Sequence, residues 1–355
     1  MTVSHGSGGP TVMCPVCLAD IDNWDTLDYW RHDPDADDEW VKVDIPPDLS
    51  PAQRRRYQYG AYVRCEKGSV GGNVHHLPAR YGLFGEPVLL GFVGLTESGK
   101  SHLLTSMVGR IDGLSEYQIA VEPLDPELHR RFRENSVDPL IARNEALPGT
   151  PDRTTALRDA FIVRYGTGPE RVVALFDVSG GDLADTGMGR EFLWIADGLF
   201  FVIDPDHIAG SKAGDMTFVN VLSIVRERER RPRGAAIILN KADKERFEEP
   251  AARWLRSGEG TLDPVDFLRE SADVYAYLQR NGALALAAPY EAAMCEKGTL
   301  HVASPTGGVK ASEENDKGKG RYPRGVTPMR VLRPLVAMLA MTGVLTGPQA
   351  ELIGV

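Results

Sequence analysis

Residues 87–101 read Pro87-Val-Leu-Leu-Gly-Phe-Val-Gly94-Leu-Thr-Glu-Ser-Gly99-Lys100-Ser101, an apolar run that passes directly into a glycine-rich turn. The last eight residues fit G-x-x-x-x-G-K-[ST], and a helical pattern begins at Lys100. Strand, turn and helix together are the context in which this pattern binds phosphate. The glycines let backbone N–H groups surround the phosphates, Lys100 faces the β- and γ-phosphates, and Ser101 offers a hydroxyl to Mg²⁺. The predicted nucleotide-contacting residues of this loop are Gly94, Glu97, Ser98, Gly99, Lys100, Ser101 and His102.

Apolar runs of the same kind recur through the rest of the chain, and helical patterns lie between them. Strands that alternate with helices predict βαβ units and an α/β fold, with a mostly parallel sheet covered by helices on both faces. Residues 156–165 and 171–178 are separated by only a short turn, so we expect them to form an antiparallel hairpin. The six predicted strands are 87–94, 156–165, 171–178, 197–205, 235–240 and 299–304.

Asp177 ends one of these predicted strands and begins the sequence Asp177-Val-Ser-Gly180, which fits D-x-x-G. A carboxylate at the carboxyl end of a strand beside a phosphate loop is where a Mg²⁺ shell needs it. The glycine three residues later can donate its N–H to a γ-phosphate. An aspartate that caps a turn gives the same short pattern, but its position after a strand favours a functional role. We therefore predict Asp177 as a Mg²⁺ ligand and Gly180 as a γ-phosphate contact.

A threonine that contacts both Mg²⁺ and the γ-phosphate is expected before the hairpin. Thr154 and Thr155 directly precede residues 156–165, and their distance from Asp177 accommodates two strands and a turn. We predict Thr155 for this role and keep Thr154 as the alternative. Exposed loop threonines without a role would give the same sequence.

The run Asn240-Lys241-Ala242-Asp243 follows a later apolar strand and fits N-K-x-D. The Asp243 carboxylate can accept two hydrogen bonds from the N1–H and N2–H₂ groups of guanine, an edge that adenine lacks. The Lys241 stem can lie along the base, and Asn240 can tie this turn to the phosphate loop. Ser304 ends the last predicted strand and is predicted to contact the nucleotide, in a loop where a backbone N–H is expected to meet the base.

The N-terminal part of the chain carries three of the four cysteines. Cys14-Pro-Val-Cys17 is a turn suited to holding Zn²⁺ from one side, and Cys65 follows 48 residues later. His75 is the predicted fourth ligand of a Cys₃His site, with His76 as the alternative. Reduced cysteines that bind no metal stay open as a second interpretation. The predicted organisation is a disordered leader at 1–13, a zinc-ribbon-like module at 14–80, the nucleotide-binding domain at 86–345 and a tail at 346–355.

Composition excludes several classes of protein. The 355 residues are 42% hydrophobic, which is ordinary for a soluble globular chain, and carry a net charge of −10. That charge argues against nucleic acid as a partner. No apolar run approaches the roughly 20 residues of a membrane-spanning helix, and no export signal is present. Few cysteines and no export signal predict a cytoplasmic protein without a membrane partner.

The segments GLTESGKS, DVSG and NKAD, in this order after strands, resemble the translation-factor and Ras-like class of P-loop GTPases over residues 86–345. The cysteine-containing unit, the long segment 102–154 and the lead-in HHLPARYG are similar to bacterial double-GTPase domains of conflict and signalling systems. The resemblance implies a switch that binds Mg²⁺·GTP, hydrolyses it slowly, and signals to a protein partner, either a second GTPase or a homodimer mate. It gives catalytic roles to Lys100, Thr155, Asp177 and Gly180.

Two departures from the family pattern bear on activity. Gly181 occupies the position where Ras-like proteins often carry a glutamine that orients water, so hydrolysis is expected to be slow or to use another residue. Asp182, Glu191 or an arginine of a partner are candidate sources. The segment 102–154 predicts an extra strand and helix, either as a lid or partner surface or as an insertion without a role. A non-hydrolysing guanine-nucleotide module is the main alternative, and the NKAD segment opposes an ATPase or nucleotide kinase.

Overall fold

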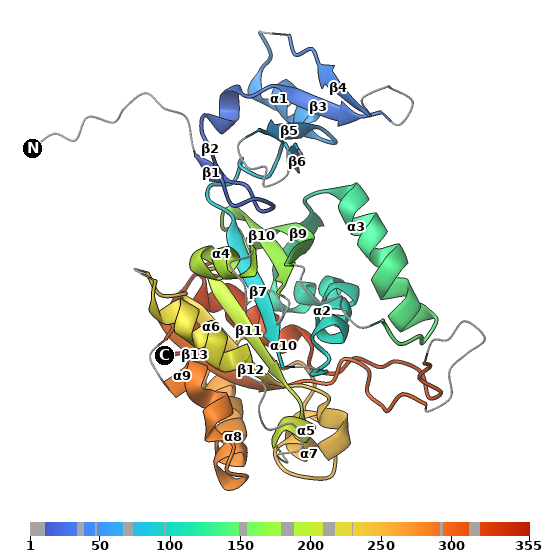
Figure 1. Ribbon diagram of the computed structural model, residues 1–355, viewed down its shortest axis with the longest axis vertical. Helices are drawn as coiled ribbons and strands as arrows, with labels where there is room; N and C mark the ends of the chain where they lie inside the picture. Colours follow the sequence, from blue (N-terminus) through green and yellow to red (C-terminus); the bar gives the residue numbers. More distant parts are fainter. Residues whose placement is uncertain are drawn as a thin grey trace, which may run out of the picture.

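The computed structural model describes residues 11–33, 39–46, 48–66, 74–95, 97–148, 155–178, 188–208, 217–228, 230–291, 294–311 and 320–355. At its centre lies a seven-stranded sheet (Figure 1). The predicted α/β fold with a mostly parallel sheet is therefore confirmed, but the predicted number of six strands is wrong. In spatial order the strands are β13 (Lys297–Val302), β12 (Gly234–Leu239), β11 (Gly198–Ile203), β7 (Val88–Gly94), β10 (Glu170–Asp177), β9 (Ala156–Tyr165) and β8 (Ile119–Pro123).

The additional strand, β8, comes from the long segment that precedes Thr155. It pairs antiparallel with β9, so that Val121 faces Val163 and Pro123 faces Phe161. Strand β9 is ten residues long, and its outer edge offers backbone groups that a neighbouring strand can satisfy. The first five strands of the order run parallel, and β9 forms the expected antiparallel hairpin with β10.

Helices cover both faces of the sheet because its central strands are apolar on both sides. In β7, Leu89 and Val93 join one hydrophobic cluster, whereas Leu90 and Phe92 join the other. Helices α2 (Lys100–Gly109) and α10 (Leu332–Met341) pack on the second face, and α4 (Met188–Ile195) and α6 (Thr217–Arg226) pack on the first. Among the described helices, none is long and apolar enough to cross a lipid bilayer.

The remaining helical segments lie at the ends and edges of the sheet. The longest, α8 (Pro264–Arg280), begins at Asp263, whose carboxylate accepts from the Val265 N–H, and it packs beside β13. The others are α3 (Pro126–Phe132), the π-helix η3 (Arg133–Ala142), α5 (Pro205–Ile208), α7 (Ala251–Trp254), α9 (Ala288–Glu291), α11 (Pro348–Glu351) and the 3₁₀ turns η2 (Ile111–Tyr117), η5 (Ala242–Glu245) and η6 (Leu284–Ala287).

The N-terminal unit sits at one end of the molecule, shown at the top of Figure 1. It contains the hairpin β1 (Val12–Met13) and β2 (Asp20–Ile21), and a four-stranded antiparallel sheet. Val12 and Met13, which we assigned to a disordered leader, form β1, because Val12 is buried near Trp24. Residues 1–10 of that leader lie outside the described part. The other elements are η1 (Trp24–Thr26), β3 (Tyr29–His32), β4 (Trp40–Val43), α1 (Pro51–Gln58), β5 (Tyr62–Cys65) and β6 (His75–Pro78).

One hydrophobic cluster extends from the N-terminal unit into the main sheet. It includes Trp24 and Leu77 of the N-terminal unit together with Phe176 of β10 and Phe192 of α4. The end of the chain is packed as well, because Ile353 is fully buried and the carbonyl of Gly354 accepts from the Gly298 N–H at 2.9 Å. The residues that we described as a tail therefore lie against β13.

A group of charged side chains is buried between α8, β13 and the start of α10. We call Glu270, His301, Arg330 and Arg333 the enclosed cluster; each is at most 2% exposed. Glu270 contacts His301 at 3.2 Å and Arg330 at 2.8 Å, and its other oxygen accepts from the Val302 N–H. The Arg333 guanidinium lies 3.5 Å from the centre of the Phe267 ring. These contacts fix the chain that follows β13 against the sheet.

Candidate functional site

The predicted site residues meet at the carboxyl edge of the main sheet. The phosphate loop follows β7, Asp177 ends β10, the NKAD segment follows β12, and Ser304 follows β13. These four strands run parallel, so their carboxyl ends lie on one edge, where ligands bind in open α/β sheets. The fold thus brings together residues that are up to 210 positions apart in the chain.

Two glycines of the phosphate loop lie where a side chain would not fit. A Cβ at Gly94 would be 2.5 Å from the Ser98 hydroxyl oxygen, and a Cβ at Gly99 would be 2.9 Å from the Asn240 side-chain nitrogen. Gly99 also has a φ of +82°, a conformation that favours glycine. Both glycines of the pattern are therefore required by close packing of the loop, and Thr96 lies outside the described residues.

Lys100 and Ser101 both approach Asp177. The Lys100 ammonium pairs with one carboxylate oxygen and donates to the Val178 carbonyl at 2.9 Å, while the Ser101 hydroxyl lies 3.4 Å from the other oxygen. Ammonium, hydroxyl and carboxylate are the groups that a Mg²⁺·phosphate ligand requires. Lys100 and Ser101, both predicted site residues, therefore lie against the third, Asp177.

Sequence reasoning missed a fourth member of this group. A terminal nitrogen of Arg158 lies 3.4 Å from Asp177 Oδ2, the oxygen that Ser101 also approaches. We call Lys100, Ser101, Arg158 and Asp177 the edge cluster. Nothing in the linear sequence marks Arg158, because its position depends on how β9 pairs with β10.

The NKAD segment is tied to the phosphate loop by two hydrogen bonds. The Asn240 side-chain amide donates to the Ser98 carbonyl at 2.8 Å, and the Lys241 ammonium donates to the Glu97 carbonyl at 2.5 Å. The predicted role of Asn240 as a tie between the two turns is present in the geometry. These contacts hold the two turns in a fixed relation.

Asp204, a second residue that sequence reasoning missed, anchors Lys241. It follows β11, is fully buried, and contacts the Lys241 ammonium at 2.9 Å and His207 Nδ1 at 3.2 Å. Burial opposes ionisation of Asp204, but His207 and Lys241 outweigh it and hold its pKa well below the usual range. Asp204 follows an apolar strand as Asp177 does, so this pattern was a usable signal.

On the far side of the edge, Asp243 and Ser304 contact each other directly. The Ser304 hydroxyl donates to the Asp243 carboxylate and accepts from the Gly307 N–H at 3.0 Å. The backbone N–H of Ser304 itself donates to the Met329 carbonyl at 3.0 Å, because Ser304 and Met329 form an antiparallel bridge. The expected contact between a backbone N–H of this loop and a base stays a prediction.

The side chain of His102, predicted to contact nucleotide, contacts Leu147 and Tyr322. Its Nε2 accepts from the Leu147 N–H at 3.3 Å, and its ring meets the Tyr322 ring edge-on. Burial, with Lys241 and Lys310 nearby, lowers the pKa of His102 to about 4. The neutral imidazole therefore stabilises the packing of the segment around Leu147 against α2.

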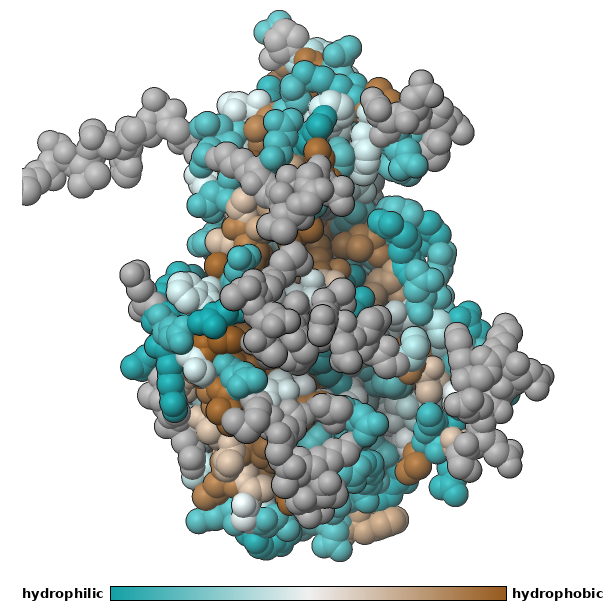
Figure 2. Space-filling model, in the orientation of Figure 1, coloured by the Kyte–Doolittle hydropathy of each residue, from teal (hydrophilic) through white to brown (hydrophobic). Residues whose placement is uncertain are grey.

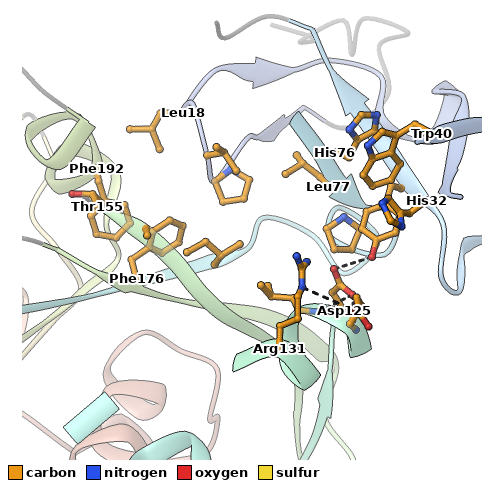
Figure 3. Close-up of a pocket in the computed structure, with 18 of the residues that line it drawn as sticks. Leu18, His32, Trp40, His76, Leu77, Asp125, Arg131, Thr155, Phe176 and Phe192 are labelled. Carbon is orange, nitrogen blue, oxygen red and sulfur yellow. Dashed lines mark hydrogen bonds and ion pairs between the residues drawn. The ribbon is translucent and has the colours of Figure 1, made fainter. Parts of the chain in front are cut away.

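Thr155 lines a pocket of about 560 Å³ between the N-terminal unit and the main sheet. Figure 3 shows it beside Phe176 and Phe192, across from the stacked rings of Trp40 and His76, and Figure 2 shows apolar side chains gathered in this recess. Thr155 precedes Ala156, whose strand partner is Asp177. Thr154, Gly180, Gly181 and Asp182 lie outside the described residues, and Glu191 is exposed on α4.

The four predicted zinc ligands are brought together in the N-terminal unit. The ligand atoms of Cys14, Cys17, Cys65 and His75 all lie within 4.8 Å of one another. Cys17 and Cys65 sulfurs are 3.7 Å apart, and the Cys14 sulfur is 3.9 Å from His75 Nδ1. Cys65 and His75 are neighbours because β5 pairs with β6, and Cys14 and Cys17 come from the turn between β1 and β2.

The same strand register separates His76 from the cysteines. Neighbouring residues of a strand point to opposite faces. His76 accordingly stacks on Trp40, with ring centres 3.6 Å apart and an angle of 4° between the planes. Burial and the charge of Arg64 lower the pKa of His76 to about 4. Of the two histidines, the geometry selects His75 as the residue able to complete the cluster.

No protein-family model matches this chain, and no curated protein sequence matches it. Several solved structures are similar in part. The GTP-bound GTPase-like domain of Ski7 from S. cerevisiae is 13% identical over 64% of this chain and 47% of its own, with a TM-score of 0.32. The bacterial elongation factor EF-Sec is 14% identical over 62% and 26%, with a TM-score of 0.28. The G domain of the T. maritima FeoB iron transporter is 11% identical over 61% and 86%, with a TM-score of 0.23.

The matched region covers less than half of the Ski7 and EF-Sec chains. At these identities and TM-scores the similarity adds no weight to an assignment of function. The assignment therefore rests on the residues at the carboxyl edge of the sheet.

Proposed function

We propose that this protein binds GTP with Mg²⁺ at the carboxyl edge of its main sheet and hydrolyses it slowly to GDP and phosphate. One observation carries the proposal. The phosphate loop and the NKAD segment, which recognise opposite ends of a guanine nucleotide, are joined by the Asn240–Ser98 and Lys241–Glu97 hydrogen bonds. A nucleotide that spans both turns would fit this arrangement.

Each residue of the edge has a definite role in this proposal. The loop amides and Lys100 would hold the β- and γ-phosphates, and Lys241 and Asp243 would contact the base. The donor set of Ser101 and Asp177 fits Mg²⁺, which prefers oxygen ligands and keeps several waters. Bound there, the metal would neutralise charge on the phosphate oxygens. Thr155 would complete this site only after leaving the pocket that it lines, and Gly180 would contact the γ-phosphate.

Selectivity for guanine can be tested by exchanging the hydrogen-bonding character of Asp243. We expect labelled GTP to be displaced by GTP and not by ATP. In Asp243→Asn the carboxylate acceptor becomes an amide with a donor, so GTP affinity should fall and xanthosine triphosphate, which has a carbonyl at C2, should bind better. Glu245→Gln, in the same 3₁₀ turn, is the control. Equal displacement by ATP would reject the proposed selectivity.

Hydrolysis is tested separately from binding. Under single-turnover conditions, release of phosphate from GTP should be slow and should stop when Mg²⁺ is chelated. The competing function is a guanine-nucleotide module without hydrolysis, which is favoured by the absence of a side chain at Gly181. Tight GTP binding without phosphate release, alone or with candidate partners, would establish that alternative.

We also propose that the N-terminal cluster holds a structural Zn²⁺. Zn–S bonds of about 2.3 Å give a tetrahedron whose sulfurs are about 3.8 Å apart, close to the 3.7 Å between Cys17 and Cys65. Purified protein should contain one zinc per chain, and His75→Ala should lose it more readily on chelation. His76→Ala, the neighbouring residue on the opposite face, should keep it. Equal zinc content in both variants would reject His75 as a ligand.

The output of the switch is proposed to be read by a protein partner, either a second GTPase or another copy of this chain. The proposal comes from the family resemblance. Size-exclusion chromatography with a non-hydrolysable GTP analogue and with GDP tests the homodimer directly. A GTP-specific increase in mass would support it, and identical monomeric mass in both states would reject it.

A further inference from the structure

Strand β9 contains an irregularity next to the metal-binding edge. Asp159 pairs with Leu175 of β10, whereas Leu157 pairs with Phe176, so Arg158 is an extra residue opposite one step of β10. This is a β-bulge, a feature that redirects a side chain and is common beside active sites. The bulge explains why Arg158 reaches Asp177 at the end of β10.

The charges of the edge cluster do not balance. Asp177 is 3% exposed at its side chain and lies between two cations, Lys100 and Arg158. The cluster therefore carries a net charge of +1 beside the phosphate loop. A guanidinium stays protonated in proteins and has five N–H donors, and the contact with Asp177 is made by one terminal nitrogen. An incoming phosphate would meet a cation that already faces the site.

The hydrolysis proposed above needs a positive group of this kind. Water must form a bond to the γ-phosphorus while the bond from phosphorus to the bridging oxygen breaks. The bonding electron pair leaves with the β-phosphate of GDP, and the protons of water pass to the released phosphate and to solvent. Negative charge accumulates on the transferred oxygens, and an arginine there is worth about 10³–10⁵ in rate. Gly181 offers no side chain for this task.

We propose that Arg158 is a catalytic residue of this reaction, a cation supplied by the chain's own strand β9 to the γ-phosphate. Its guanidinium contacts Asp177 in this structure, and it would donate to the γ-phosphate oxygens where Asp177 serves the metal. The inference rests on the proposed GTP hydrolysis. The Arg158 side chain is 32% exposed, against 3% for Asp177, so the guanidinium has room to change partners.

The test compares Arg158→Ala and Arg158→Lys with Arg164→Ala, a control on the same strand whose side chain is half-exposed and pairs with Glu170. Three quantities are measured: the affinity for labelled GDP, the affinity for GDP with aluminium fluoride, which mimics the transferred phosphoryl group, and the single-turnover rate. We expect Arg158→Ala to keep GDP affinity within threefold, to bind GDP with aluminium fluoride at least 100-fold more weakly, and to hydrolyse at least 100-fold more slowly. Added guanidinium ion should restore part of the rate.

The outcomes separate this inference from the function on which it rests. An unchanged rate and unchanged aluminium fluoride affinity in Arg158→Ala would reject the inference and leave GTP hydrolysis standing. Equal losses of GDP and of GDP with aluminium fluoride would also reject it, because Arg158 would then only position Asp177. If the wild-type protein binds GTP but releases no phosphate, the proposed hydrolysis fails, and the role of Arg158 with it.

Discussion

The edge cluster and the enclosed cluster each place one carboxylate between two cations, yet their surroundings are opposite. Glu270 takes both of its cations and a backbone N–H from the chain itself, and no member of the enclosed cluster is more than 2% exposed. Asp177 has one arginine at 3.4 Å, and the Lys100 and Arg158 side chains are 11% and 32% exposed. Among the described residues the enclosed cluster is shielded from solvent, whereas both cations of the edge cluster are partly open to it.

This difference in exposure distinguishes a cluster that stabilises the fold from a cluster proposed to bind a ligand, although each contains one carboxylate and two cations. Burying charges is costly, and the cost is recovered only when every partner is in place. In the enclosed cluster the partners are permanent, so its charges hold the segment after β13. In the edge cluster Lys100 and Arg158 share the Asp177 carboxylate, and both of their side chains are partly exposed. Disrupting each cluster should therefore change a different quantity.

The largest effect is expected from Glu270→Gln. Loss of the negative charge leaves the buried Arg330 and Arg333 guanidiniums without the carboxylate that they share, which costs about 3–5 kcal/mol in free energy of unfolding. Urea unfolding measures this loss, and the folded variant should bind GTP as the wild type does. Glu227→Gln, which removes the exposed partner of Arg190, should cost less than about 1 kcal/mol. Similar small losses in both variants would remove the distinction between the clusters.

The stabilisation that Glu270 gives to the enclosed cluster should be lost only at strongly acidic pH. Burial by itself would raise the pKa of Glu270, but His301 and Arg330 outweigh burial and bring it down to about 2. The unfolded chain, with a pKa near 4.5, takes up the proton first, so the stabilisation is complete above that pH and is lost as the pH falls toward 2. The difference in unfolding free energy between wild type and Glu270→Gln should therefore be constant from pH 7 to 5. It should shrink by up to about 3 kcal/mol below pH 4.5. A difference that does not depend on pH would contradict this assignment.

For the edge cluster, Lys100→Ala should show the reverse pattern. We expect GTP affinity to fall about 100-fold or more, about 3 kcal/mol, because a charge that faces the phosphates is lost. The unfolding free energy without nucleotide should change less than in Glu270→Gln, since Arg158 still pairs with Asp177. Lys244→Ala, which removes a partly exposed cation paired with Asp206, is the matched control and should bind GTP normally. If Lys100→Ala lowered the unfolding free energy but kept GTP affinity, Lys100 would stabilise the fold rather than bind phosphate.

The smallest effect is expected from Asp204→Asn, which combines features of both clusters. Asp204 is enclosed like Glu270 but holds Lys241, a residue of the edge. We expect a roughly tenfold loss of GTP affinity, about 1.4 kcal/mol, measured by titration with labelled nucleotide. Asp206→Asn, two residues away and half-exposed, should have no effect on affinity. Equal effects of the two variants would show that burial of Asp204 is irrelevant to the site.

Much of the edge could be predicted because its motifs are local. The phosphate loop, Asp177 and NKAD each follow an apolar strand directly, so a parallel sheet places them on one edge without further information. Arg158 could not be found this way. It depends on a one-residue shift in pairing between β9 and β10, which the composition of β9 does not record.

The remaining differences have similar physical causes. The extra strand expected within segment 102–154 is β8, but its place in the main sheet depends on pairing with the outer edge of β9, which the sequence does not record. The choice between His75 and His76 was left open because only the register of β6 against β5 decides which face each occupies. The enclosed cluster draws residues from three segments, and none of its members stands in a recognisable motif.

The N-terminal unit and the main sheet share one hydrophobic cluster, so we expect their unfolding to be cooperative. Trp24 and Leu77 are packed in the same apolar cluster as Phe176, which precedes Asp177 on β10, and Phe192 of α4. Two regions that share a core unfold together rather than in separate steps. Heating should therefore produce one melting transition, and chelation of the proposed zinc should lower the temperature at which the main sheet melts. The small N-terminal unit is thus part of the thermal stability of the larger domain.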